Sequence, residues 1–112
     1  MSKLQEIFDC PEPVALVTGS GSRRVGRAIA IHLASLGCRV AVHANTSVDQ
    51  AEEVARYISN KYSKQAMVTQ GSLCDEETPQ RLIDETVANF KRIDILVNSA
   101  AIWQPKALEK IT

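Results

Sequence analysis

The chain has 112 residues, 45% hydrophobic and 23% charged, a composition that predicts one small globular domain. Its 13 basic and 13 acidic side chains balance, which argues against a nucleic-acid or membrane-surface binder. The cysteines Cys10, Cys38 and Cys74 lack metal-ligand or disulfide spacing and predict free thiols in a reducing compartment. With no recognisable signal peptide or membrane-spanning run, we expect a cytoplasmic protein that binds neither nucleic acid nor membrane.

Hydrophobic spacing predicts strands that alternate with helices after a lead-in over residues 1–13. The predicted strands cover residues 14–17, 39–43, 65–70 and 93–97. The first helix follows a glycine-rich turn and ends at Gly37. The second begins at Thr46 or Ser47 and fades near Tyr62, while the third begins at Asp75 or Thr78. Residues 98–105 are expected to form a loop, and residues 107–111 to begin another helix.

Each helix should bury one apolar stripe. The expected buried positions are Val25, Ile29, Leu33 and Leu36 in the first helix, Ala51, Val54, Ala55 and Ile58 in the second, and Leu82, Ile83, Val87 and Phe90 in the third. The fourth strand, IDILV, is almost wholly apolar, which predicts a central strand covered on both faces. The βαβαβαβ order predicts an α/β fold in which residues 1–112 form one domain with a parallel sheet and right-handed crossovers.

The stretch VALVTGSGSRRVGRAIA is the most informative part of the chain. A buried strand runs through glycines directly into a helix, so free backbone N–H groups and the positive end of the helix dipole converge on one place. Glycine there permits a tight turn and close approach of a pyrophosphate. An ordinary strand-to-helix turn is the alternative. The strand–helix–strand context favours a dinucleotide site at the carboxyl ends of the strands.

Together, the glycine-turn segment and the later DILVNSAAIW resemble the N-terminal half of a short-chain dehydrogenase/reductase. Within that family, the segment RRVGRAIA is most similar to pteridine-reductase and 3-oxoacyl-carrier-protein-reductase-like members. The resemblance implies a Rossmann-type sheet that stops here after its fourth strand. It also implies hydride transfer between the nicotinamide of NADP(H) and a carbonyl or pterin-type small-molecule substrate.

The resemblance transfers cofactor contacts to a defined set of positions. They are Gly19, Ser22, Arg23, Arg24, Val25, Asn45, Thr46, Ser47, Ser72, Leu73, Asn98, Ala100 and Ala101. Some positions differ from the family pattern: Gly26 comes one residue late, Arg23 or Arg24 replaces the middle glycine, and Ser72 replaces an aspartate. His43, at the end of the second strand, either packs inside the protein or approaches the adenosine half of the cofactor.

NADP(H) rather than NAD(H) is expected from the end of the second strand. An NAD site of this type uses an acid there to accept from the ribose 2′-hydroxyl. This chain has no acid before Asp49, and instead offers hydrogen-bond donors at Asn45–Ser47 and the two arginines of the turn.

The family's catalytic serine and Tyr-x-x-x-Lys pair lie C-terminal to the stretch that this chain matches. Tyr57 and Lys61 do have that spacing, but they fall on the helix between the second and third strands, where an exposed helix surface is the expected role. We therefore assign no catalytic residue and no metal ligand. The alternative to an enzyme part is a non-catalytic module that binds a dinucleotide or a partner.

The fourth strand should have an open outer edge in the 3-2-1-4 strand order that the resemblance implies. Unpaired strand edges are templates for pairing with another chain. We therefore expect the chain to self-associate or to require a C-terminal complement.

Overall fold

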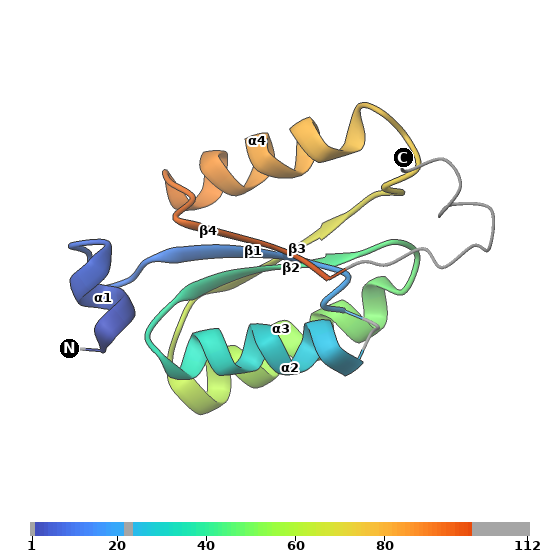
Figure 1. Ribbon diagram of the computed structural model, residues 1–112. Coiled ribbons are helices and arrows are strands. Elements are labelled where there is room, and N and C mark those ends of the chain that lie inside the picture. Colours follow the sequence, from blue (N-terminus) through green and yellow to red (C-terminus); the bar gives the residue numbers. More distant parts are fainter. Residues whose placement is uncertain (1, 22–23, 100–112) are drawn as a thin grey trace.

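The computed structural model describes residues 2–21 and 24–99 and shows a four-stranded parallel sheet with the order β3-β2-β1-β4 (Figure 1). The α/β fold and strand order are as predicted. The strands are β1 (Val14–Thr18), β2 (Arg39–Ala44), β3 (Ala66–Gln70) and β4 (Ile95–Asn98). The helices are α1 (Lys3–Ile7), α2 (Arg24–Ser35), α3 (Val48–Tyr62) and α4 (Thr78–Phe90).

Helices cover both faces of the sheet: α2 and α3 lie on one face and α4 on the other (Figure 1). Alternation along β1 produces two cores, because Ala15 and Val17 face α2 and α3 while Val14 and Leu16 face α4. Among the expected helix positions, Ala51, Val54, Ile58, Leu82 and Phe90 are buried. The crossover helix after β1, α2, lies on one face of the sheet, and the crossover helix before β4, α4, lies on the other. The strand order therefore reverses between β1 and β4, and the carboxyl ends of these two strands meet at that topological switch point.

The short helix α1 was not predicted from the sequence. Ser2 and Gln5 form a capping box, in which Gln5 N–H donates to Ser2 Oγ at 3.3 Å and Ser2 N–H donates to Gln5 Oε1 at 2.6 Å. This pattern is a known start signal for helices. Ser2 Oγ also donates to Leu36 O at 2.6 Å, which ties α1 to the end of α2.

The prediction of a central, fully covered fourth strand is wrong. Strand β4 pairs only with β1 in the described part of the chain, begins at Ile95 rather than residue 93, and leaves Leu96 58% exposed. Val25 and Val87, expected to be buried, are 67% and 41% exposed. An apolar pattern identifies a face but not whether another element covers it.

The helix ends follow the predictions in part. Gly37 has φ +100°, a conformation that suits glycine, immediately after α2. Ser47 is the N-cap of α3, although its side chain makes no capping hydrogen bond. The N-cap of α4 is Glu77 rather than Asp75 or Thr78, and Thr78 is instead a buried first helical residue.

All three cysteines are free, and Cys10 and Cys38 are buried. Burial raises the pKa of Cys38 to about 11. Within residues 2–21 and 24–99, no group of histidine, cysteine and acidic side chains has a metal-binding arrangement. None of the helices in this part combines the length and apolar character needed to cross a bilayer.

Candidate functional site

The turn after β1 runs from Gly19 to Gly21 and leads toward the start of α2. Gly19 has φ +71°, where a side chain would be strained. A Cβ on Gly21 would lie 2.8 Å from Ala51 Cβ, so this glycine lets α3 approach the turn. The turn therefore depends on glycine both for its conformation and for its close packing.

Gly26 lies in the first turns of α2 and packs directly against the glycine turn. A Cβ at this position would meet Gly19 O at 2.9 Å, Ser20 Cα at 3.0 Å and Ser99 Oγ at 2.6 Å. Although Gly26 comes one residue late relative to the family pattern, it provides the close helix-to-turn packing expected of a final glycine in such a site.

The ends of β1 and β4 are joined through Thr18. Its hydroxyl donates a hydrogen bond to Asn98 Oδ1 at 3.0 Å, and Ser99 N–H donates to Thr18 Oγ1 at 3.2 Å. Ser99 Oγ also donates to Thr18 O. Ser99 thus bonds the residues that lead into the glycine turn to the end of β4.

His43, near the end of β2, contacts every residue of the turn. Gly19 N–H donates to His43 Nδ1 at 2.9 Å, His43 N–H donates to Ser20 Oγ at 3.1 Å, and Gly21 N–H donates to His43 O at 3.0 Å. The other ring nitrogen, Nε2, lies 2.8 Å from Gly71 O. With 1% exposure, the ring packs inside the protein, which decides between the two roles considered for it.

A shallow hollow lies where β2 leads into α3. It has a volume of about 280 Å³ and is lined by Thr46, Ser47, Val48, Asp49 and Gln50. The predicted donors Asn45 and Thr46 are exposed here, and Ser47 is half-buried. Because the first N–H groups of a helix have no intrahelical partner, this position is suited to an anionic group.

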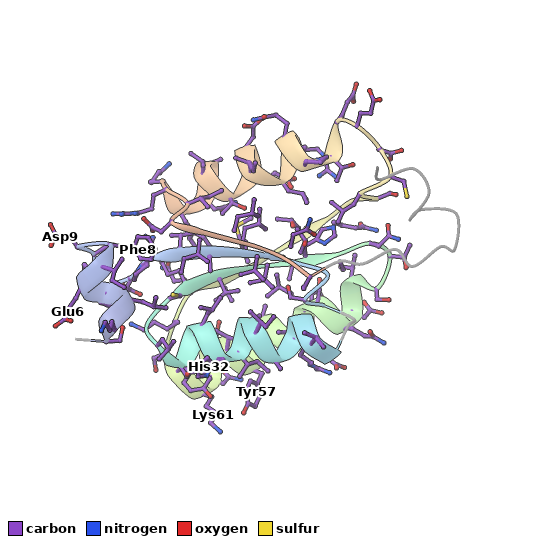
Figure 2. The ribbon with its side chains drawn as sticks, in the orientation of Figure 1. Glu6, Phe8, Asp9, His32, Tyr57 and Lys61 are labelled. Atoms are coloured by element: carbon purple, nitrogen blue, oxygen red, sulfur yellow. The ribbon has the colours of Figure 1, made fainter. Side chains whose placement is uncertain are left out.

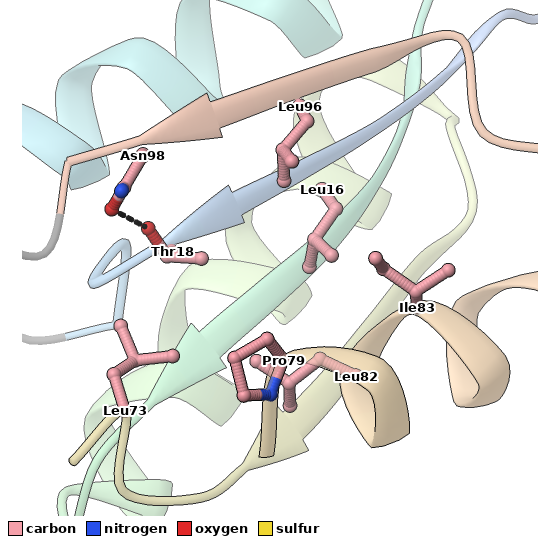
Figure 3. Close-up of a pocket in the computed structure, with 8 residues that line it drawn as sticks. All are labelled: Leu16, Thr18, Leu73, Pro79, Leu82, Ile83, Leu96 and Asn98. Atoms are coloured by element: carbon pink, nitrogen blue, oxygen red, sulfur yellow. Dashed lines mark hydrogen bonds between the residues drawn. The ribbon is translucent and has the colours of Figure 1, made fainter. Parts of the chain in front are cut away.

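A second pocket lies between β1, β4 and α4, with a volume of about 360 Å³ (Figure 3). Its floor is apolar, and Leu73, Thr18 and Asn98 stand at the end nearest the glycine turn. The neighbouring Ser72 accepts a hydrogen bond from Cys74 N–H at 3.2 Å. A flat apolar group that carries a few polar atoms would suit this pocket.

The structure brings several predicted residues to one edge of the sheet, namely Gly19, Asn45, Thr46, Ser47, Ser72, Leu73 and Asn98. Arg24 is the first residue of α2, and Val25 follows it as an exposed side chain rather than a core one. The predicted residues Ser22, Arg23, Ala100 and Ala101 lie outside the described residues. The bridging role of His43 was not predicted.

Tyr57 and Lys61 lie on the outer surface of α3, pointing away from the sheet (Figure 2). Tyr57 is 43% exposed, and Lys61 Nζ lies 5.6 Å from the centre of its ring. The hydroxyl of Tyr57 raises the pKa of Lys61 through a hydrogen bond. The pair is an exposed neighbour contact, as predicted, and lies away from the glycine turn.

The family match and the similar proteins of known name agree on one family. The family described as short chain dehydrogenase matches residues 13–112. Short-chain dehydrogenase/reductase FrzI of Cladobotryum sp is 41% identical over 101 residues, which cover 90% of this chain and 38% of that protein. The chloroplastic NADPH-dependent aldehyde reductase 2 of Arabidopsis thaliana is 45% identical over 102 residues, 82% of this chain and 37% of that protein.

A solved structure shows the same fold. The crystal structure of a dehydrogenase/reductase from Sinorhizobium meliloti 1021 has a TM-score of 0.77 and 36% identity to this chain, over 81% of this chain and 35% of that one. The chain therefore spans less than two fifths of the length of these three relatives.

Proposed function

Because this chain belongs to the short-chain dehydrogenase family, we propose that it forms the NADP(H)-binding part of an oxidoreductase acting on a carbonyl or pterin-type substrate. The observation that carries the proposal is the contact of Gly26 with the glycine turn, where a Cβ would lie 2.9 Å from Gly19 O. When bound, the nicotinamide cofactor would supply hydride, and the residues of this chain would hold its nucleotide part.

The residues present fit a dinucleotide along the carboxyl edge of the sheet. The turn and the start of α2 would face the pyrophosphate, because the helix dipole and its first N–H groups point there. The Leu73 end of the apolar pocket would border the adenine, and the hollow around Ser47 would take the ribose 2′-phosphate. Asn98, at the end of β4, would face the nicotinamide half across Thr18.

We propose NADP(H) over NAD(H) because hydrogen-bond donors rather than an acid come directly after β2, and because the sequence between β1 and α2 leads into two arginines. Asn45, Thr46 and Ser47 precede Asp49, which lines the hollow, and Arg23 and Arg24 follow the glycine turn in the sequence. The name of the Arabidopsis relative specifies NADPH for that protein, which supports the same choice here.

The double substitution Arg23→Ala/Arg24→Ala should weaken NADPH binding about tenfold or more and leave NADH nearly unchanged, because charge-assisted hydrogen bonds to a phosphate are lost. Titration calorimetry with both cofactors measures this difference. Arg27→Ala is the matched control, since Arg27 is an exposed α2 arginine whose contact is with Glu53 at 3.9 Å. Equal or better binding of NADH by the unmodified chain would contradict the preference.

The chain by itself should bind cofactor without turning over a carbonyl substrate. Proton transfer by a positioned acid or base typically contributes about 10²–10⁴-fold, and the tyrosine of this chain that has the family spacing lies on the surface of α3. Tyr57→Phe should therefore leave NADPH affinity and any background oxidation of NADPH unchanged, as followed by absorbance. A reductase activity that Tyr57→Phe abolished would contradict this assignment and show that Tyr57 is catalytic.

We also propose that the 112-residue chain, made alone, self-associates along β4, where Leu96 is 58% exposed and no further strand pairs in the described residues. An unpaired strand edge beside an apolar pocket favours pairing with a second chain. Leu96→Lys should shift the chain toward monomer in light scattering over a concentration series. Ile7→Lys is the control, because Ile7 is 62% exposed on α1, which is not part of the sheet. A monodisperse monomer at every concentration would refute the proposal.

A further inference from the structure

We propose that His43 is a positioning residue that holds the glycine turn and the β3–α4 loop in register, and that it does so as a neutral imidazole protonated on Nε2. The inference deepens the proposed function and rests on it for its effect on NADPH. The ring itself does not contact a ligand in this proposal, because only 1% of His43 is exposed and both ring nitrogens face backbone groups of the protein.

The protonation state follows from the two partners of the ring. Gly19 N–H can only donate, so Nδ1 must carry a lone pair to accept from it at 2.9 Å. Gly71 O can only accept, so Nε2 must carry the proton across its 2.8 Å contact. A doubly protonated ring would bring two N–H groups together at Gly19 and break that contact.

The ring thereby connects two parts of the proposed cofactor cradle that are distant in sequence. Gly19 opens the turn that would face the pyrophosphate, and Gly71 lies two residues before Leu73, which lines the pocket proposed for adenine. The backbone reinforces this connection: Gly21 N–H donates to His43 O at 3.0 Å and Gly71 N–H donates to Ala44 O at 3.1 Å. A shift of the ring would move both parts together.

The charged and titratable groups of the described elements that pack on this face lie in the β3–α4 loop and on α4. Alternation along β2 places His43 on the face that Ala41 shares with α4. Strand β1, the turn and β3 contribute no titratable side chain near this end of the sheet. The titratable and charged groups of the adjoining loop and α4 are Cys74, Asp75, Glu76, Glu77, Arg81, Asp84 and Glu85, of which Arg81 pairs with Glu85 at 3.2 Å.

Two substitutions separate the two ring contacts. In His43→Asn, the side-chain oxygen can replace Nδ1 as the acceptor for Gly19, whereas the amide cannot reach Gly71. In His43→Gln, the amide can reach Gly71 O, but Gly19 N–H loses its acceptor. An unpaired Gly19 N–H in His43→Gln should cost more than an unpaired Gly71 carbonyl in His43→Asn, because a buried donor has no other partner. We therefore expect His43→Gln to raise the NADPH dissociation constant about tenfold or more, and His43→Asn to fall between His43→Gln and the unmodified chain.

A cofactor-independent measurement keeps this inference distinct from the proposed function. Nitrogen NMR of the full chain should show Nδ1 unprotonated and Nε2 protonated at neutral pH. Hydrogen exchange of the Gly19 amide should be slow in the unmodified chain and in His43→Asn, and faster in His43→Gln. Both results can be obtained even if the chain binds no NADPH, in which case the proposed function alone fails.

Rescue by His43→Asn is the readout that a merely structural role would not give. Gly19 amide protection and NADPH affinity should both be better preserved in His43→Asn than in His43→Gln. His32→Asn, which removes the exposed histidine of α2, should behave like the unmodified chain. A neutral ring protonated on Nδ1, a charged ring at neutral pH, or unchanged Gly19 exchange in His43→Gln would overturn the proposal.

Discussion

Replacing Gly26 by alanine is expected to destabilise the fold by about 1–3 kcal/mol, the usual range for overpacking, and to reduce NADPH affinity by more than about tenfold. In an ordinary helix interior the same change is stabilising, because alanine has the higher helix propensity. Here the new methyl would lie 2.9 Å from Gly19 O and 3.0 Å from Ser20 Cα, and both are backbone atoms. The turn or the helix must therefore move.

Urea denaturation of the two proteins measures the change in the free energy of unfolding, and calorimetry with NADPH measures the change in affinity. Ala28→Val is the matched control, because Ala28 is an exposed α2 position where added bulk meets solvent. That control should change stability by less than about 1 kcal/mol, which reflects helix propensity alone. A Gly26→Ala protein at least as stable as the parent would show that the contact is not restrictive.

Asp94→Ala is expected to cost about 2–3 kcal/mol of stability, because it leaves a buried backbone donor without its charged acceptor. Asp94 Oδ2 accepts from Val14 N–H at 2.8 Å, and Arg92 donates to the same carboxylate, with Nη2 at 2.6 Å from Oδ1. The Asp94 side chain is 7% exposed and Val14 is fully buried. The carboxylate therefore fastens the start of β1 beside the segment that leads into β4.

The same carboxylate should make stability depend on acid pH. Burial raises the pKa of Asp94, but hydrogen bonds from Arg92 and Val14 outweigh that effect and hold the pKa below its usual value. A lowered folded-state pKa contributes stability above the unfolded value, about 3.9, and this contribution is lost as pH falls through the folded value. Asp94→Ala should therefore flatten the acid limb of a plot of unfolding free energy against pH.

Arg92→Gln separates the ion pair from the buried hydrogen bond to Val14. The Arg92 side chain is 40% exposed, so its removal should cost much less stability than Asp94→Ala, because solvent screens the pair. Equal losses in Arg92→Gln and Asp94→Ala would contradict the view that the Val14 contact dominates.

What the sequence determined by itself was the order of strands and helices and the place of the glycine turn. These depend on local spacing: β1 and α2 show their periodicities within a few residues of each other, and a turn such as Gly19–Gly21 is specified by residues that lie within it. The same local signals located the proposed cofactor site, because parallel strands bring their carboxyl ends to one edge.

The tertiary structure alone decided how much of each apolar stripe is covered and which distant groups bond. Leu96 and Val25 follow apolar patterns but remain exposed, because burial depends on which element packs above them. His43 reaches Gly19 and Gly71 over 24 and 28 residues, and Ser99 reaches Thr18 over 81. Such contacts leave no periodic trace in the sequence, since they arise only after the sheet has brought the strand ends together.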